Sequence, residues 1–183
     1  IPADLEAGKL IGASIYGCTL VAVDGSYDDV NRLCSEIADN YRWAFVNVNM
    51  RPFYAEGSKT LGYETIEQLD WKLPDHVIVP AASGELYTKI WRGFNEMAEL
   101  DLVSGPVKTN MHIAQAQGCS PIVEAFLAKE SQVIPVKPDT IARSLAIGNP
   151  AAGAFALQVA KDSSGTATAV PEQEVEAGMK LLA

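Results

Sequence analysis

The residues best suited to binding chemistry lie in a short segment that follows a strongly apolar run, Ala81-Ala82-Ser83-Gly84-Glu85-Leu86. If a helix begins here, its first amide groups have no partner within the helix and lie near the positive end of the helix dipole, where anions bind well. Ser83 adds a hydroxyl group, and Gly84 permits a ligand to approach the backbone closely. The pattern therefore predicts a phosphate-binding loop made of Ala81, Ala82, Ser83, Gly84, Glu85 and Leu86.

The same segment also has a purely structural interpretation. Small residues allow a tight turn from a strand into a helix, and the segment matches neither the P-loop pattern nor Gly-x-Gly-x-x-Gly. Glu85 would also place a negative charge near a bound phosphate. On pattern alone, the structural interpretation is slightly favoured.

A second candidate segment runs from Asn47 to Arg51, at the end of another apolar run. Asparagine side chains are costly to bury unless they hydrogen-bond a partner, and the planar guanidinium of arginine suits a carboxylate or a phosphate. Asn47, Asn49 and Arg51 are therefore candidates for substrate binding. Alternatively, the asparagines pair with neighbouring backbone and Arg51 is solvated. Lys59 is expected to be a solvated surface lysine.

The composition excludes several classes of function. The chain of 183 residues carries a net charge of −9, whereas nucleic-acid binding requires a basic surface. The two histidines, His76 and His112, are too few for a metal site and lie in apolar runs, which argues against a Ser-His-Asp triad. The three cysteines lack the Cys-x-x-Cys spacing and are expected to be reduced thiols in the cytoplasm. No apolar run approaches the ~20 residues that span a membrane.

Short apolar runs alternate with segments of helical periodicity, as in α/β proteins. Strands are expected at residues 19–23, 43–49, 76–79, 109–116 and 166–170. Helices are expected behind a capping box at Ser26 and Asp29, and at residues 58–69, 86–97, 122–127, 141–145, 154–161 and after 171. Such units connect right-handedly, so we predict a three-layer α/β fold with a mostly parallel sheet and helices on both faces. Ligands then bind at the carboxyl ends of the strands.

The expected elements also predict which residues are buried. The strand at 76–79 is apolar enough to be buried on both faces. The helix at 58–69 should turn Leu61, Ile66 and Leu69 inward. The helix behind Ser26 should bury a stripe with helical spacing, formed by Val30, Leu33, Cys34, Ile37 and Ala38.

Several separated motifs resemble segments of one known family. The longest is Arg-Pro-Phe-Tyr-Ala-Glu-Gly-Ser-Lys-Thr-Leu-Gly-Tyr-Glu at residues 51–64. Others are Gly8-Lys9-Leu10, Val23-Asp24-Gly25-Ser26, Leu73-Pro74-Asp75-His76, Gln117-Gly118-Cys119-Ser120-Pro121 and Ala146-Ile147-Gly148-Asn149-Pro150. In this order, they resemble the pyridoxal-phosphate-dependent threonine synthases over nearly the whole chain.

This resemblance implies a fold type II pyridoxal-phosphate scaffold. Residues 1–50 would be the later part of its smaller domain, and residues 51–183 the central part of its larger, cofactor-binding domain. The loop at Ala81–Leu86 would cradle the cofactor phosphate, which raises the phosphate interpretation above the structural one. Residues 142–149 would line the cofactor ring, and Asn47, Asn49 and Arg51 would meet the substrate phosphate. The chain departs from the family at Tyr54, where well-known members have arginine.

The resemblance also implies that an essential group is missing. The family's cofactor-bonding lysine occupies a Ser-Phe-Lys-Asp-Arg-type motif upstream of the segments matched here, and no lysine of this chain has that context. We therefore expect a fragment of a threonine synthase that is inactive alone and has no catalytic residue of its own.

Two other functions remain open at this stage: a non-catalytic binding module on the same scaffold, or a fragment of a threonine or serine dehydratase. Arg51 together with residues 56–60 favours the synthase. A partial fold leaves apolar faces uncovered, so a homo-oligomer is expected. The expected small-molecule partner is an amino-acid phosphate, and neither nucleic acid nor a membrane is expected.

Overall fold

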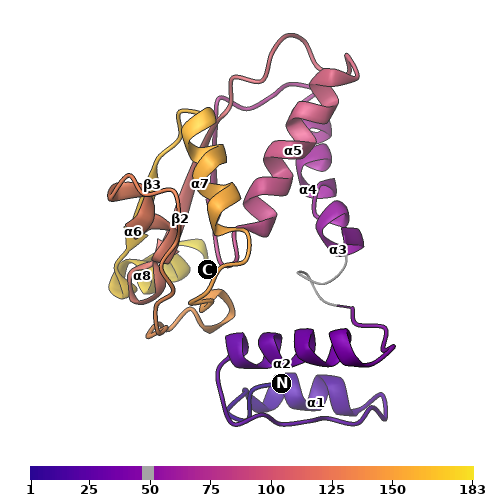
Figure 1. Ribbon diagram of the computed structural model, residues 1–183. Helices are drawn as coiled ribbons and strands as arrows, with labels where there is room; N and C mark the ends of the chain where they lie inside the picture. The colour runs from indigo at the N-terminus through magenta and orange to yellow at the C-terminus, as the bar shows by residue number, and fades with distance from the viewer. Residues whose placement is uncertain (47–51) are drawn as a thin grey trace. The chain divides into compact units, whose positions relative to one another are not determined.

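The computed structural model describes residues 1–46 and 52–183 (Figure 1). The chain forms two compact units, Ile1–Val46 and Asn47–Ala183. The assignment of these units to the smaller and larger domains of the family remains a prediction.

The N-terminal unit contains two helices, α1 (Ala7–Ser14) and α2 (Tyr27–Asn40). The predicted capping box of α2 is confirmed. The Asp29 N–H donates to Ser26 Oγ at 3.3 Å, and the Ser26 N–H donates to Asp29 Oδ2 at 2.9 Å. The Ser26 hydroxyl also donates to Asp29 Oδ2, at 2.7 Å, and this bond together with the one from the Ser26 N–H lowers the pKa of the Asp29 carboxyl. The start of α2 is therefore fixed by its own side chains.

Other expectations for the N-terminal unit are wrong. Residues 19–23 form no strand, but Val23 makes a single parallel bridge with Pro2. Residues 43–46 are not in a strand either, and the rest of that predicted strand lies outside the described residues. A strand needs a continuous neighbour for its backbone hydrogen bonds, and within residues 1–46 only the first three residues pair with the 21–23 segment.

The predicted apolar stripe of α2 is present but not buried. Leu33 is exposed, and Val30, Cys34, Ile37 and Ala38 are half-buried. Helical periodicity identified the correct face of the helix. Full burial would require a second apolar surface packed over that whole face.

The C-terminal unit is built on three parallel strands in the order β1-β2-β3 (Figure 1). They are β1 (His76–Pro80), β2 (Asn110–Ala116) and β3 (Ala167–Val170). Val79 lies opposite Ile113, which lies opposite Ala167 on the other side. The predicted α/β class, with a parallel sheet and helices on both faces, is confirmed.

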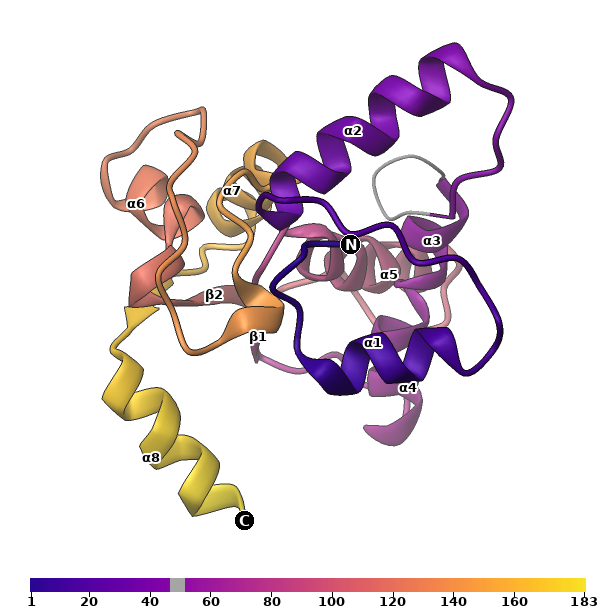
Figure 2. The same cartoon turned by 90° about the horizontal axis from the view of Figure 1, so that it is seen from below.

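Six α-helices and two short 3₁₀ turns surround these strands in the described part of this unit. The α-helices are α3 (Pro52–Gly57), α4 (Thr60–Gln68), α5 (Glu85–Glu99), α6 (Pro121–Leu127), α7 (Gly153–Asp162) and α8 (Glu172–Leu182). The 3₁₀ turns are η1 (Gln117–Cys119) and η2 (Arg143–Leu145). The helix predicted at 58–69 is α4, whereas α3 was not predicted, and the helix predicted at 141–145 is a 3₁₀ turn. Figure 2 shows α8 leading away from the end of β3. No described helix has the length and apolar character needed to cross a membrane.

The core of the C-terminal unit joins residues of β1 and β2 to residues of α5, α6 and α7. Its largest fully buried side chains include those of Tyr87, Phe94, Met111, Ile122 and Leu157. The order of strand, helix and strand along the chain brings these separated residues together.

Helix α4 packs against α5 through a different face from the predicted one. Ile66 is fully buried as predicted, but Leu61 and Leu69 are exposed. Gly62 takes the contact position, because a Cβ there would lie 3.0 Å from the Ile90 carbonyl oxygen. This close approach of two helix backbones selects the Gly62–Ile66 face.

The prediction that β1 is buried on both faces is also wrong. Val79 is buried, whereas Ile78 is 71% exposed and His76 is exposed as well. Among the described strands, β1 lies at the edge and pairs only with β2.

Candidate functional site

The predicted phosphate loop lies between β1 and α5, at the carboxyl end of the sheet. Ala81 is buried, and its N–H donates to the Ala114 carbonyl of β2 at 2.9 Å. Gly84 has a φ of 84°, in the left-handed region that favours glycine. A Cβ on Gly84 would lie 3.1 Å from both the Ala152 carbonyl oxygen and the Ala156 Cβ. Gly84 therefore lets the chain turn into α5 while packed against the start of α7.

Several backbone amides of this loop are open. Within the described residues, the N–H groups of Ala82, Ser83, Gly84 and Leu86 have no hydrogen-bond partner. The Glu85 N–H makes one long bond, of 3.4 Å, to Ser83 Oγ. The start of α5 thus has amide donors at the positive end of the helix dipole and no side-chain cap. Such donors can hold an anion, but they supply no acid, base or nucleophile.

Two carbonyl groups of the loop are held by residues outside it. The Ala81 carbonyl accepts a bond from Gln115 Nε2 at 3.3 Å, and the Ser83 carbonyl accepts one from the Ala152 N–H at 3.0 Å. In a trans peptide, the C=O and the following N–H point in opposite directions. Because the described chain contains no cis peptide, these two bonds turn the N–H groups of Ala82 and Gly84 away from Gln115 and Ala152.

The three predicted substrate-binding residues, Asn47, Asn49 and Arg51, lie outside the described residues. Tyr54, at the position where the resemblance leads one to expect arginine, lies on α3 and is 55% exposed. Its backbone carbonyl accepts a hydrogen bond from Ser58 Oγ at 3.2 Å.

The stretch from Ala142 to Asn149, predicted to line a cofactor ring, includes η2 and is tied to the preceding connector. The Val136 N–H donates to the Gly148 carbonyl at 3.0 Å. Glu172, the first residue of α8, binds the two residues that precede this stretch, Thr140 and Ile141. Its carboxylate accepts from Thr140 Oγ1 and the Ile141 N–H at 3.0 and 3.1 Å, and from the Gly118 N–H at 3.3 Å.

The charge of Glu172 is favoured by these bonds. Partial desolvation would raise the pKa of its carboxyl, but the hydrogen bonds from Thr140, Ile141 and Gly118 lower it overall. Glu172 thus joins the ends of β2 and β3 to the stretch that leads into η2.

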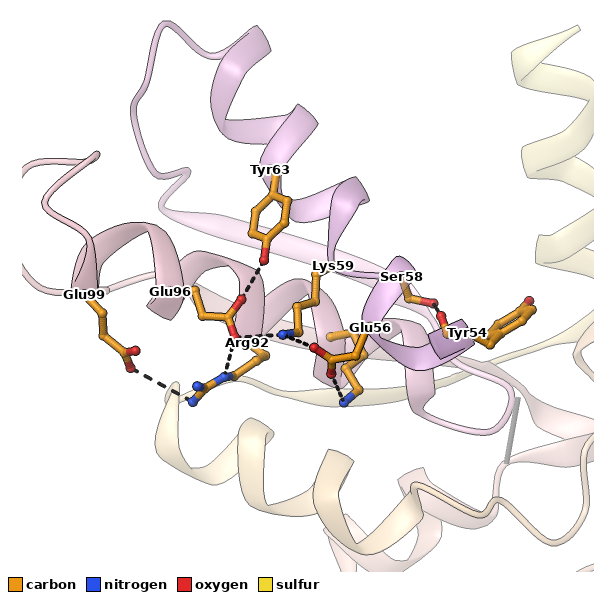
Figure 3. Close-up of polar contacts among 9 residues, drawn as sticks. Tyr54, Glu56, Ser58, Lys59, Tyr63, Arg92, Glu96 and Glu99 are labelled. Atoms are coloured by element: carbon orange, nitrogen blue, oxygen red, sulfur yellow. Dashed lines mark hydrogen bonds and ion pairs between the residues drawn. The ribbon is translucent and has the colours of Figure 1, made fainter. Parts of the chain in front are cut away.

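A cluster of charged side chains joins α3 and α4 to α5 (Figure 3). Lys59 Nζ lies 2.8 Å from Glu96 Oε1 and also contacts the Glu56 carboxylate. Glu96 further accepts from Tyr63 Oη at 2.6 Å and from Arg92 Nε at 2.9 Å. The prediction that Lys59 is solvated is therefore wrong, since its side chain is only 11% exposed.

The cluster fixes the charges of its members. Hydrogen bonds from Lys59 and Tyr63 lower the pKa of the Glu96 carboxyl to about 2. Bonds to Glu56 and Glu96 raise the pKa of Lys59. Lys59 is thus held as a cation between two carboxylates, which is unsuited to a nucleophilic lysine.

The histidines lie on adjacent strands and contact each other. His76 Nδ1 lies 3.0 Å from His112 Nε2, and the Thr166 N–H donates to His112 Nδ1. Among the described residues, no group of three or more His, Cys, Asp or Glu side chains could hold a metal ion.

The parallel sheet and the open start of α5 define the class: an α/β protein whose candidate ligand site lies at the carboxyl ends of its strands. The model of the pyridoxal-phosphate dependent enzyme family matches residues 1–183, so the chain belongs to that family.

Similar proteins point within this family to threonine synthases. The chain is 38% identical over 177 residues to the threonine synthase of Methanocaldococcus jannaschii, and 33% identical over 177 residues to that of Methanosarcina acetivorans. Each match covers 96% of this chain but 43% of the relative, so the chain spans less than half the length of these curated relatives. The crystal structure of a T.th. threonine deaminase has the same fold, with a TM-score of 0.70 and 15% identity over 99% of this chain and 56% of that one.

Sequence reasoning missed the residues that hold the site in place: Gln115, Glu96 and Glu172. Polar residues in apolar runs are costly to bury without partners, so Gln115 in the middle of a predicted strand was a usable signal. Glu96 and Glu172 lay in helical patterns that are equally typical of solvated glutamates.

Proposed function

We propose that this chain supplies the phosphate-binding part of a threonine synthase, which converts O-phosphohomoserine and water to threonine and phosphate. The open amides between β1 and α5 carry this proposal, because they lie where the resemblance puts the cofactor phosphate. The similarity to threonine synthases over nearly the whole chain supports the choice of reaction.

The residues of the loop fit the phosphate of pyridoxal phosphate. A phosphate is a compact dianion, and the amides of Ala82, Ser83, Gly84 and Leu86 offer donors with no competing partner in the described chain. When bound, the cofactor supplies an electron sink for charge that develops on the substrate. The chain's own contribution is to bind and orient the phosphate, while Asn47, Asn49 and Arg51 are proposed to meet the substrate phosphate.

The chain alone is proposed to be inactive. None of its lysines lies in a Ser-Phe-Lys-Asp-Arg-type context, and Lys59 is held by Glu56 and Glu96. We expect no phosphate release when the chain is incubated with O-phosphohomoserine and pyridoxal phosphate. Turnover above a heat-denatured control would contradict this part of the proposal.

Binding of the cofactor tests the other part. Titration of the chain with pyridoxal phosphate, followed by fluorescence, should show saturable binding that inorganic phosphate competes away. Pyridoxal without the phosphate should bind much more weakly. Equal binding of both compounds would mean that the loop is only a turn.

A dehydratase is the second candidate, and the fold shared with a threonine deaminase is compatible with it. The two candidates differ in the substrate, because O-phosphohomoserine carries a phosphate and threonine does not. Calorimetric titration with both compounds separates them. Binding of O-phosphohomoserine alone supports the synthase, whereas binding of threonine alone supports the dehydratase.

We also propose self-association and a cytoplasmic location. Large apolar side chains such as Ile78, Phe155 and Leu182 are at least 70% exposed, which favours association of copies. No disulfide joins Cys18, Cys34 or Cys119, as expected in a reducing compartment. Light scattering after size exclusion should give a mass above the 19.6 kDa of one chain. A well-dispersed monomer would contradict the association.

A further inference from the structure

Gln115 has a polar amide group that lies inside the core of the C-terminal unit. It lies on β2 and is 2% exposed. Its Oε1 accepts from the N–H groups of Ile122 and Val123, at 3.0 and 3.1 Å. Since backbone N–H groups can only donate, the oxygen must face α6 and the NH₂ group must face Ala81.

The two ends of this amide act on two different helix starts. The oxygen occupies the first amides of α6, so these donors are satisfied and do not compete for an anion. The NH₂ group donates to the Ala81 carbonyl at 3.3 Å. This bond turns the Ala82 N–H away from Gln115 and leaves it open in the loop before α5.

We propose that Gln115 is a positioning residue for the phosphate loop: it closes the start of α6 and sets the direction of the Ala82 amide at the start of α5. The inference rests on the proposed function, since it assumes that the loop binds a phosphate. According to this proposal, a buried residue outside the loop determines that the first amides of α5, and not those of α6, are available to the anion.

The test uses two variants of Gln115 and one control. Gln115→Glu keeps an oxygen for the α6 amides but replaces the donor to Ala81 with an oxygen, and Gln115→Met removes both bonds at similar volume. Thr109→Val is the control, because the Thr109 hydroxyl is buried and bonds the Pro74 carbonyl at 2.6 Å beyond the other end of the strands.

At pH 8, we expect both Gln115 variants to bind pyridoxal phosphate about tenfold more weakly or worse, the effect of losing one well-placed hydrogen bond. Thr109→Val should bind like the unchanged chain even if it is less stable. Affinity unchanged in Gln115→Glu would overturn the proposal, as would an equal loss in Thr109→Val, because a merely structural role would affect both.

A ligand-free readout separates this inference from the proposed function. In ¹⁵N-labelled chain, the Ala82 amide resonance should shift in Gln115→Glu and remain in place in Thr109→Val. If the unchanged chain fails to bind pyridoxal phosphate, the proposed function fails, and the Ala82 resonance still decides whether Gln115 sets the loop. No shift there would overturn the positioning role.

If neither Gln115 variant folds, hydrogen exchange in the unchanged chain tests the proposed contact. One side-chain NH₂ proton of Gln115 should exchange slowly with solvent, because the bond to Ala81 is buried. Fast exchange of both protons would contradict the proposed contact.

Discussion

Helix α2 of the N-terminal unit and helix α5 of the C-terminal unit are held by opposite means. Helix α2 has a complete capping box at Ser26 and Asp29 and no buried residue. Helix α5 has no side-chain hydrogen bond at its cap, but it buries Tyr87, Ile90, Gly93 and Phe94. Local hydrogen bonds fix the start of the first helix, and core packing stabilises the second.

This difference bears directly on function. A helix whose first amides are taken by a capping side chain offers fewer donors to a ligand. Because α5 draws its stability from the core and from the cluster around Glu96, its first turn can stay open. A side-chain cap would stabilise α5 at the expense of the proposed phosphate site.

The largest expected effect on the free energy of unfolding comes from a change in helix α5, which is stabilised by the core. Phe94→Ala removes a fully buried ring and should lower the free energy of unfolding by about 3–5 kcal/mol. Leu33→Ala, at the exposed position of the α2 stripe, should cost well under ~1 kcal/mol. Urea unfolding followed by circular dichroism measures both.

A milder substitution keeps the test possible if the Phe94→Ala variant does not fold. Ile66→Val should cost about 0.5–1.5 kcal/mol, since it deletes one buried methyl group. If Leu33→Ala were as harmful as Phe94→Ala, the contrast between the two units would be wrong.

The charged cluster should contribute a smaller, pH-dependent amount. Glu96→Gln should cost about 1–3 kcal/mol at pH 7, because hydrogen bonds to an ionised carboxylate are lost. The folded pKa of Glu96, about 2, lies below the ordinary 4.5. Its stabilisation is therefore complete above pH ~4.5 and is lost as the pH falls towards 2.

The measurement compares unfolding of the two chains at several pH values. The difference between Glu96→Gln and the unchanged chain should shrink as the pH falls from about 4.5 to 2. Glu99→Gln is the matched control, since Glu99 is 62% exposed and lies 4.0 Å from Arg92, and it should cost under ~0.5 kcal/mol. A pH-independent difference would rule out the ionised carboxylate as the source of the stability.

The smallest expected effect is at the capped helix. Ser26→Ala removes both hydrogen bonds that the Ser26 hydroxyl makes with Asp29 and should cost about 1 kcal/mol of helix stability. Amide exchange should accelerate within residues 27–40 and stay unchanged in α5. Ser35→Ala, on the same helix but away from the cap, is the control. Faster exchange in α5 would show that the two units do not open independently.

What the sequence could predict depended on local signals. The capping box at Ser26, the strand at 109–116 and the small-residue turn at Gly84 each follow from a few neighbouring residues, and the structure contains all three. Packing over long sequence distances was beyond such signals. Lys59 is 37 residues from Glu96 in sequence, and only the close contact of α4 with α5 brings the two together.

The candidate site shows the same limit. The loop at 81–86 was predictable because strand, small residues and helix follow one another. The residues that shape it, Gln115 and Ala152, are 34 or more positions away from Ala81. They act through the carbonyl groups of Ala81 and Ser83. No local pattern specifies a contact of that kind.

The most direct test of the phosphate-binding loop is a map of amide resonances. ¹⁵N-labelled chain is titrated with pyridoxal phosphate and, separately, with pyridoxal. We expect the phosphate compound to shift the amides of residues 82–86 first and most, and to leave α2 unchanged. Largest shifts elsewhere, or identical shifts with pyridoxal, would contradict it.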